Sequence, residues 1–599
     1  MIAPPASRSR LPDFAVIAFG SLVTLVVSGY QFGRGNHTVY LLEGLRLADP
    51  KLFTNDWFVS STLQYHAAFS HITGWLMTLG WIEPAFLAGY VALVVLWQTA
   101  WLKLTRALGG SRLTYALSVM LYYLSAGGIG LGVYQFLQDG CFLPSNVSSV
   151  ALLWGVYLWI TGRRGWAGVA MGIAGFFHLN FATGVVAAWI GLNAWSLIAD
   201  RRREPMRVAP MIFGTLAALV PSGVNIFNAL REKLQQNTSI PLDQFVEVYV
   251  RFRHTHHFDP LGWPVALWVS FLWPIPLAVY ACVIRRREGT EDSILRQATH
   301  VFVLLVAAQV TAFLFAGVWF VSETLVQLMF WRFSIYLKLL SCIGAAWLIC
   351  DARLLTPALR RALLIAIPVV LATVVGGSVA LDNVTTTPGS SLELALRTFH
   401  THRAAFILFT ACAFVPLVLS IAESRGRSIS PGTSLITLFA CAIIAIVGWD
   451  HWLGWGMTPE QVDADYRKIC SWAEESTPVD VVFLVPPAET AFRLEAKRAI
   501  VVNFKHVPQL GGEILEWLKR LEAVLGTSDL KSFPRDYVRT LSALDERYAA
   551  REPEELIGVA RAYSARYVVV PRDWGNTYRR LLVYKSGRYF VYDLNQQGE

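Results

Sequence analysis

The sequence predicts an α-helical multi-pass membrane protein that carries a small α/β domain at its C-terminus. Of its 599 residues, 54% are hydrophobic and only 16% are charged, whereas a soluble domain averages about 25% charged residues. Apolar runs long enough to cross about 30 Å of hydrocarbon recur from Phe14 to Trp449. Beyond Asp450 the composition becomes that of a soluble domain. We therefore expect a polytopic membrane domain at 1–450 and an α/β domain at 451–599.

The apolar runs give about thirteen membrane spans, with boundaries uncertain by a few residues. They fall at 14–30, 84–102, 113–132, 147–162, 166–179, 182–199, 209–228, 263–284, 298–319, 333–350, 362–381, 404–421 and 434–450. Two of the connections are long, 31–83 and 229–262. The apolar stretch 67–82 is too short for a span, so we expect it to lie in the membrane interface.

The distribution of basic residues predicts the orientation of these spans. One set of alternate loops totals 71 residues and holds 20 Lys and Arg, while the other set totals 138 residues and holds 10. Basic residues favour the cytoplasmic side of a membrane, so the set of loops that is rich in them, together with the N-terminus, is expected in the cytoplasm. Thirteen crossings then place the C-terminal domain on the periplasmic or extracytoplasmic side. We expect the protein in the inner (plasma) membrane. The pI near 9.2 reflects this bias and gives no reason to expect nucleic-acid binding.

The C-terminal domain alternates apolar runs with amphipathic segments, which is typical of an α/β fold. Strands are expected at 480–485, 499–503, 566–571 and 589–594, and helices at 459–475, 512–524 and 552–564. The domain lacks the GxGxxG, Walker, GxSxG and HExxH motifs. Its expected role is to cap a membrane cavity or to recognise a substrate.

The first outer loop, 31–83, supplies two candidate catalytic carboxylates. Asp49 precedes Pro50, which breaks a helix, and Asp56 stands where it can cap the next helix. We expect both carboxylates to face one cavity beneath the C-terminal domain. Asp56 is the first choice as a general base, because Trp57 and Phe58 can seat its loop in the membrane interface.

The second outer loop, 229–262, concentrates hydrogen-bond donors suited to a phosphate. The basic residues and histidines of its last stretch are Arg251, Arg253, His254, His256 and His257. A solvated loop that attracts lipid headgroups explains the same residues. Neighbouring histidines point apart on a helix or a strand, so no metal site is predicted, although a divalent metal remains possible.

Three further polar residues sit at the edges of spans. His178 lies between two short spans and either faces a wet cavity or is a satisfied loop histidine. Glu323 and Arg332 are expected to face a cavity or each other, because an ionised group within hydrocarbon is expensive.

The spans, the carboxylates of the first outer loop and the outer α/β domain together resemble the GT-C class of membrane glycosyltransferases. The resemblance implies a polyprenyl-phosphate-linked sugar as donor, a membrane lipid environment, and an acid of the first outer loop, Asp56 in TNDWF or Asp49 in LADPKL, as base or metal ligand. Ser322-Glu323 stands where oligosaccharyltransferase members carry a Glu. The stretches YVRFRHTHHFDP and SWAEESTPVDVVFLVPP also resemble uncharacterised bacterial multi-pass proteins with domains of unknown function.

The chain departs from that class in lacking an Asp-x-Asp pair in the first loop and a Trp-Trp-Asp tripeptide in the C-terminal domain. Neither a metal-dependent reaction nor transfer to protein is therefore indicated. Two other functions fit the sequence: a transporter or flippase of a lipid-linked or envelope precursor, and a non-catalytic envelope scaffold or sensor. The sequence shows no internal repeat, and thirteen spans exceed what an anchor requires.

Overall fold

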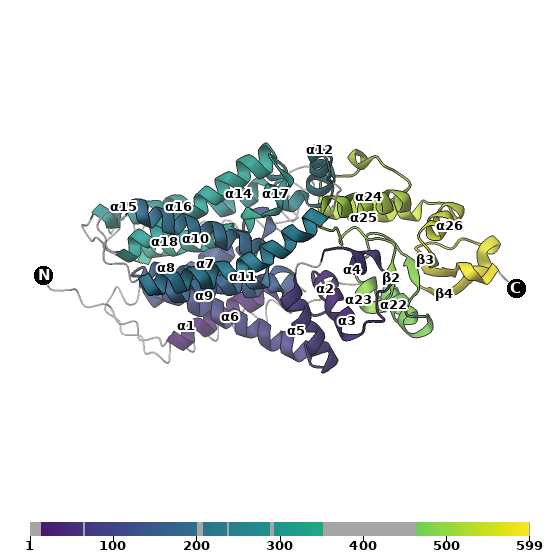
Figure 1. Ribbon diagram of the computed structural model, residues 1–599, viewed down its shortest axis with the longest axis horizontal. Coiled ribbons are helices and arrows are strands. Elements are labelled where there is room, and N and C mark those ends of the chain that lie inside the picture. Colours follow the sequence, from purple (N-terminus) through teal and green to yellow (C-terminus); the bar gives the residue numbers. More distant parts are fainter. Residues whose placement is uncertain are drawn as a thin grey trace, which may run out of the picture.

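The computed structural model describes residues 13–63, 66–199, 208–235, 239–287, 293–350 and 463–597. Figure 1 shows an elongated molecule with a helical bundle in one half and a mixed α/β domain in the other. The bundle contains α1 (Asp13–Ser28), α6 (Ile82–Ala107), α7 (Arg112–Leu124), α8 (Pro144–Ile160), α9 (Arg164–Phe177), α10 (Leu179–Ala199), α11 (Val208–Gln235), α14 (Val265–Leu272), α15 (Pro274–Arg287), α16 (Ser293–Phe313) and α18 (Ser334–Cys350).

Within the described part of the chain, five helices are long and apolar enough to cross a membrane, or six if the bent pair Leu131–Gly140 and Pro144–Ile160 forms one span. Ten of the thirteen expected spans coincide with a bundle helix or a pair of them. The other three, 362–381, 404–421 and 434–450, lie outside the described residues, as does the expected domain boundary at 450. The fold is that of a helical membrane protein.

One face of α11 shows why the bundle belongs in a membrane. Phe213, Leu216, Val220, Val224 and Phe227 are each more than half exposed, and their spacing of three or four residues places them on one side of the helix. So large an apolar surface is stable only against lipid or a partner protein. By contrast, α18 is almost entirely buried and forms the centre of the bundle.

Small residues let α9 pack closely against α11. A Cβ added at Gly168 would lie 2.0 Å from the Gly214 carbonyl oxygen, and one added at Gly172 would lie 2.0 Å from the Ala217 carbonyl oxygen. Without side chains at these positions the two backbones can approach, as small residues allow in membrane helices.

The bundle differs from expectation at two helix ends. The expected span 113–132 stops at Leu124, because Gly127, Gly128 and Gly132 adopt positive φ angles of 62°, 80° and 66° and turn the chain into short 3-10 turns. The expected outer loop 229–262 begins later, because α11 continues to Gln235.

Short helices and turns at one end of the bundle fill the expected outer loops and the outer ends of the expected spans 113–132 and 298–319. They are α2 (His37–Tyr40), α3 (Leu42–Ala48), α4 (Trp57–Ser61), α5 (Ala67–Thr78), α12 (Leu242–Phe245), α13 (Thr255–Phe258) and α17 (Glu323–Gln327), with the 3-10 turns η1 (Ala126–Gly128), η2 (Leu131–Val133), η3 (Gln138–Gly140), η5 (Pro260–Gly262) and η7 (Phe330–Phe333) and the π-helical turns η4 (Val246–Arg253) and η6 (Leu314–Val318). As expected, α3 ends immediately before Asp49 and Pro50.

The C-terminal domain is built on a five-stranded mixed sheet in the order β2-β1-β3-β5-β4. The strands are β1 (Val482–Leu484), β2 (Ala499–Ile500), β3 (Ala565–Val570), β4 (Leu582–Ser586) and β5 (Tyr589–Asp593); the helices are α22 (Ala464–Ser476), α23 (Phe492–Ala496), α24 (Gly511–Leu525), α25 (Tyr537–Ala549) and α26 (Pro553–Ala562), with turns η8 (Leu530–Ser532), η9 (Asn576–Leu581) and η10 (Leu594–Gln597). The expected strands and helices are all present, while β4, α23 and α25 were not expected.

Side chains of β3 point alternately to the two faces of this sheet, and both faces are packed. Tyr567 and Val569 join the apolar cluster of α22 and α23, while Val568 and Val570 join that of α24 and α26, as the two-residue period of a strand requires. The second cluster continues into the ends of the bundle through Trp331 and Tyr249. The C-terminal domain and the bundle therefore share one apolar core.

Candidate functional site

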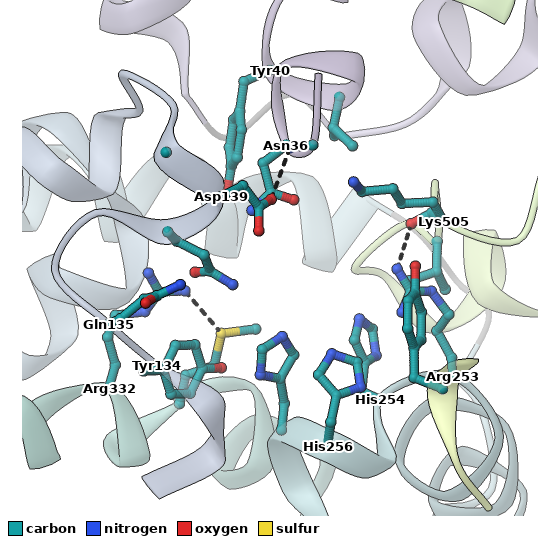
Figure 2. A pocket seen from close by; sticks show the side chains of 18 of the residues that line it. Asn36, Tyr40, Tyr134, Gln135, Asp139, Arg253, His254, His256, Arg332 and Lys505 are labelled. Carbon is teal, nitrogen blue, oxygen red and sulfur yellow. Dashed lines mark hydrogen bonds between the residues drawn. The ribbon is translucent and has the colours of Figure 1, made fainter. Parts of the chain in front are cut away.

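A cavity of about 550 Å³ lies where the bundle meets the C-terminal domain (Figure 2). Its wall comes from the end of α1, the first outer loop, the stretch 134–140, the turns around α13 and η7, and the C-terminal stretch 505–509. The polar side chains of this wall are Ser28, Gln31, Asn36, Tyr40, Tyr134, Gln135, Gln138, Asp139, Arg253, His254, His256, His257, Arg332, Lys505, His506, Gln509 and Tyr537.

Three cationic side chains reach this cavity from different elements. Arg332 stands on η7, its guanidinium 4.6 Å from the centre of the Tyr134 ring. Arg253 is the last residue of η4 and donates a hydrogen bond of 2.9 Å to the backbone carbonyl of Lys505. The side chain of Lys505 is the third cation of the wall. Figure 2 places Arg332 on one side of the cavity and Arg253 with Lys505 on the other. A ligand between them would meet positive charge from two directions.

The histidines of the wall add hydrogen-bonding groups rather than charge. Burial, followed by the charge of Arg253, lowers the pKa of His254 well below its ordinary value. Burial also lowers the pKa of His257 to about 3, although its bond to the Gly132 carbonyl opposes the shift. The pKa of His256 falls for the same main reason. At neutral pH these imidazoles are uncharged, so the positive potential comes from Arg253, Arg332 and Lys505.

Asp139 is the one acidic side chain among the described residues of the wall. Its backbone has a φ of 57°, and its Oδ2 accepts a hydrogen bond of 3.0 Å from the Asn36 amide. A Cβ at Gly35 would lie 2.6 Å from that of Asp139, so the glycine makes the approach possible. In Figure 2 the carboxylate faces the cavity from the wall opposite His254 and His256.

Five of the ten predicted site residues come together on this wall: Arg253, His254, His256, His257 and Arg332. Arg251, two positions from Arg253, points away and pairs with Glu247 at 3.4 Å. Glu323 pairs with Lys233 at 3.1 Å rather than with Arg332. His178 is buried beside His66, with ring centroids 4.7 Å apart, and is not part of the wall.

The two predicted carboxylates lie elsewhere. Asp49 is exposed at the end of α3, where it accepts a hydrogen bond from the Lys51 amide. Asp56 is fully buried and accepts hydrogen bonds from Arg493 Nε at 2.7 Å and from the Ile500 amide at 2.9 Å. It also caps α4 by accepting from the Val59 amide. The carboxylate of Asp56 is therefore used to join the first outer loop to the C-terminal domain.

Sequence analysis missed Asp139, Lys505 and His506 for an identifiable reason. Asp139 is the only acid in the stretch 135–146, and nothing near it in the sequence suggests a partner. Its contacts come from Gly35 and Asn36, about a hundred positions away. Lys505 and His506 follow an apolar strand without any recognisable motif. Only tertiary structure brings these groups together.

The donor set of the cavity does not suit a divalent metal ion. Within the described ranges, no three or more His, Cys, Asp or Glu side chains cluster as a metal site would require. The Nδ1 atoms of His254 and His257 already lie 3.0 Å and 2.6 Å from backbone carbonyl oxygens.

Comparisons with known proteins agree with this architecture. A family described as a domain of unknown function (DUF6798) matches residues 464–524, and no curated protein matches the chain. The crystal structure of ArnT from Cupriavidus metallidurans in the apo state is similar over 98% of both chains, with 12% sequence identity and a TM-score of 0.52. The crystal structure of the same protein bound to undecaprenyl phosphate is also similar over 98% of both chains, with 13% sequence identity and a TM-score of 0.47. ArnT is a GT-C, polyprenyl-phosphate-dependent glycosyltransferase, and the predicted resemblance to that class is confirmed for the fold.

Proposed function

We propose that this chain is a membrane glycosyltransferase that transfers a sugar from a polyprenyl-phosphate donor. The observation that carries the proposal is the cavity wall with three cationic side chains and one carboxylate at the junction of the bundle and the C-terminal domain. The donor's tail would lie in the bilayer beside the apolar helices, and its phosphate would enter the cavity. The GT-C fold supports the same activity.

Arg332, Arg253 and Lys505 would hold the donor phosphate. The face of the Tyr134 ring supports the guanidinium of Arg332, and the Lys505 carbonyl fixes that of Arg253. Cations that are oriented before the reaction stabilise charge that develops on a leaving phosphate. Because Arg253 is also buried, its interaction with an anion is only weakly screened by water.

Asp139 would act as the general base. The oxygen of an acceptor hydroxyl attacks the anomeric carbon and forms the new glycosidic bond. The bond between that carbon and the phosphate oxygen breaks, and its electron pair remains on the phosphate. The hydroxyl proton passes to the Asp139 carboxylate, whose position is fixed by the Asn36 amide.

The proposed reaction takes place at the outer face of the inner membrane. The excess of basic residues in one set of loops favours a cytoplasmic N-terminus and an extracytoplasmic C-terminal domain. The cavity, which contains Lys505 and Tyr537 of that domain, would then open on the same side.

The test compares Asp139→Asn with Asp49→Asn in purified protein and in cells. Asp139→Asn should lower sugar transfer by about 10²- to 10⁴-fold, the usual contribution of a general base, while binding of polyprenyl phosphate remains. Asp49 is exposed and does not line the cavity, so Asp49→Asn should transfer normally. Transfer is measured by mass spectrometry as loss of sugar from the lipid-linked pool, with and without a chelator, and the chelator should have no effect.

Full transfer by Asp139→Asn would remove this residue from the mechanism. If the wild-type protein neither binds polyprenyl phosphate nor consumes a lipid-linked sugar, the glycosyltransferase proposal fails. Movement of the intact lipid-linked sugar between leaflets would instead support a flippase.

A further inference from the structure

His506 is one of the residues that line the cavity, although it is only 2% exposed. It follows Lys505, and its ring lies 5.3 Å from that of Phe58. The Nδ1 atom of His506 lies 2.7 Å from Nη1 of Arg493. The predicted general base Asp56 holds that same arginine. Asp56, Arg493 and His506 therefore form a buried chain that ends at the cavity.

The partner of Nδ1 determines the protonation state of this imidazole. A guanidinium carries only donors and has no lone pair to offer, so in the contact with Arg493 the Nδ1 atom must accept. A neutral imidazole carries one proton, and with Nδ1 as acceptor that proton is on Nε2. Arg493 thus selects the tautomer in which Nε2–H is a donor.

Asp56 holds Arg493 in the position that selects this tautomer. Its Oδ2 accepts hydrogen bonds from Arg493 Nε and from the Ile500 amide, while its Oδ1 accepts one from the Val59 amide. Arg493 is 1% exposed and Asp56 is fully buried, so neither side chain can swing into solvent. A second proton on His506 would require Nδ1 to become a donor facing the guanidinium at 2.7 Å.

The opposite nitrogen of His506 has only a long contact. Nε2 lies 3.5 Å from Thr38 Oγ1, whereas N–H···O bonds usually measure about 2.7–3.2 Å. The Thr38 hydroxyl already donates to the Gly35 carbonyl at 2.9 Å. The N–H group at Nε2 is therefore a donor that the protein itself uses only weakly.

We propose that His506 is a permanently neutral N–H donor for a phosphate oxygen of the ligand, with Arg493 and Asp56 as positioning residues. The anionic part of a ligand belongs at this place because Lys505 and Arg253 line the same side of the cavity. The inference rests on the proposed function, since it names the group that His506 recognises. It also gives Asp56 a role in the site without contact with substrate.

The surrounding charges favour the neutral form of His506. Arg493, Lys505 and Arg253 face it, and Asp56 lies behind Arg493. Burial and then these three cations lower the pKa of His506 well below its ordinary value. The donor should therefore stay unchanged across the physiological pH range.

The first test compares two variants of His506, each of which carries an amide that mimics one of the two ring nitrogens. The amide of Gln in His506→Gln reaches the place of Nε2 and can donate there, while the shorter amide of His506→Asn reaches only the place of Nδ1 and keeps the Arg493 contact. Binding of a short-chain polyprenyl phosphate should fall roughly 10-fold in His506→Asn, as expected for a lost bond to a charged group, and less than about 3-fold in His506→Gln. Binding of the matching polyprenol, which has no phosphate, should be equal in both.

The second test removes the arginine that fixes the tautomer of His506. In the double variant Asp56→Asn/Arg493→Met, Nδ1 is free to take a proton, while Asn still caps α4. The ratio of its phosphate affinity to that of wild type should rise about 5-fold between pH 8 and pH 5.5, because a protonated imidazole binds phosphate more strongly. Since a ratio is measured at each pH, the titration of the ligand itself cancels.

Equal binding by the Asn and Gln variants, with wild-type binding intact, would overturn the role of His506 and leave the proposed function standing. A flat ratio in the double variant would remove the positioning role of Arg493 and Asp56. If the double variant fails to fold, the Gln and Asn pair alone decides the inference. If the wild-type protein does not bind polyprenyl phosphate, the proposed function itself is rejected.

Discussion

Two aspartates, Asp56 and Asp139, show how far a carboxylate's chemistry depends on its contacts. Both lie in the short helices and turns outside the long helices of the bundle, Asp56 as the N-cap of α4 and Asp139 in η3. The carboxylate of Asp56 is surrounded by a guanidinium and two backbone amides, which makes it an acceptor with no room for a substrate. Asp139 stands on the cavity wall, where an acceptor hydroxyl can approach. The sequence does not separate these environments, because Arg493 and Asn36 come from distant parts of the chain.

The buried pair predicts a large effect on stability for Asp56→Ala. The change leaves Arg493 charged and buried and removes the cap of α4. Breaking a buried pair costs about 3–5 kcal/mol. Thermal unfolding in detergent should therefore begin well below the wild-type temperature.

The matched control is Asp49→Ala in the same outer loop. Asp49 is exposed, and a surface substitution of this kind usually changes stability by less than about 0.5 kcal/mol. Similar unfolding temperatures for the two alanine variants would contradict the structural role of Asp56.

Elements were predictable from sequence wherever one face of a helix or strand is continuously apolar. The strands β1, β3 and β5 coincide with predicted strands because their residues are buried. In contrast, β4 is mostly half exposed and carries Lys585, so it lacks an apolar signal. The end of α7 was misplaced because the glycines after Leu124 lie within an apolar run, and hydrophobicity alone does not indicate a turn.

Packing of α9 against α11 predicts opposite effects for two Gly→Ala changes. A Cβ at Gly172 would meet the Ala217 carbonyl at 2.0 Å, and because both are backbone positions, one helix must shift. Gly172→Ala should lower stability by about 1–3 kcal/mol, as overpacking does. At Gly223 of α11 a Cβ meets nothing within 4 Å.

Gly223→Ala is the control, since it adds the same methyl group to open space and improves helix propensity. Both variants are compared by thermal unfolding of the purified protein in detergent. A stable Gly172→Ala protein would mean that α9 and α11 are less tightly packed than the structure shows.

At the scale of the whole molecule, the C-terminal domain completes the site. Arg34 pairs with Glu495 at 2.6 Å, Glu513 accepts from the Leu63 amide, and Gln509 accepts from the Tyr249 hydroxyl. These contacts join the domain to both predicted outer loops. The sequence indicated that the domain lies on the side of those loops, but the residues by which it reaches the cavity follow from the docked structure alone.

The orientation of the chain gives the last prediction. If the N-terminus is cytoplasmic and the number of crossings is odd, the C-terminal domain lies outside the cytoplasm, on the side where we place sugar transfer. A fluorescent protein that matures only in the cytoplasm should remain dark when fused after Glu599, while alkaline phosphatase, which needs an oxidising compartment, should be active there. Reporters fused at the N-terminus should behave in the opposite way. A bright C-terminal fusion would reverse the orientation and place the cavity, with Lys505 and His506, on the cytoplasmic side.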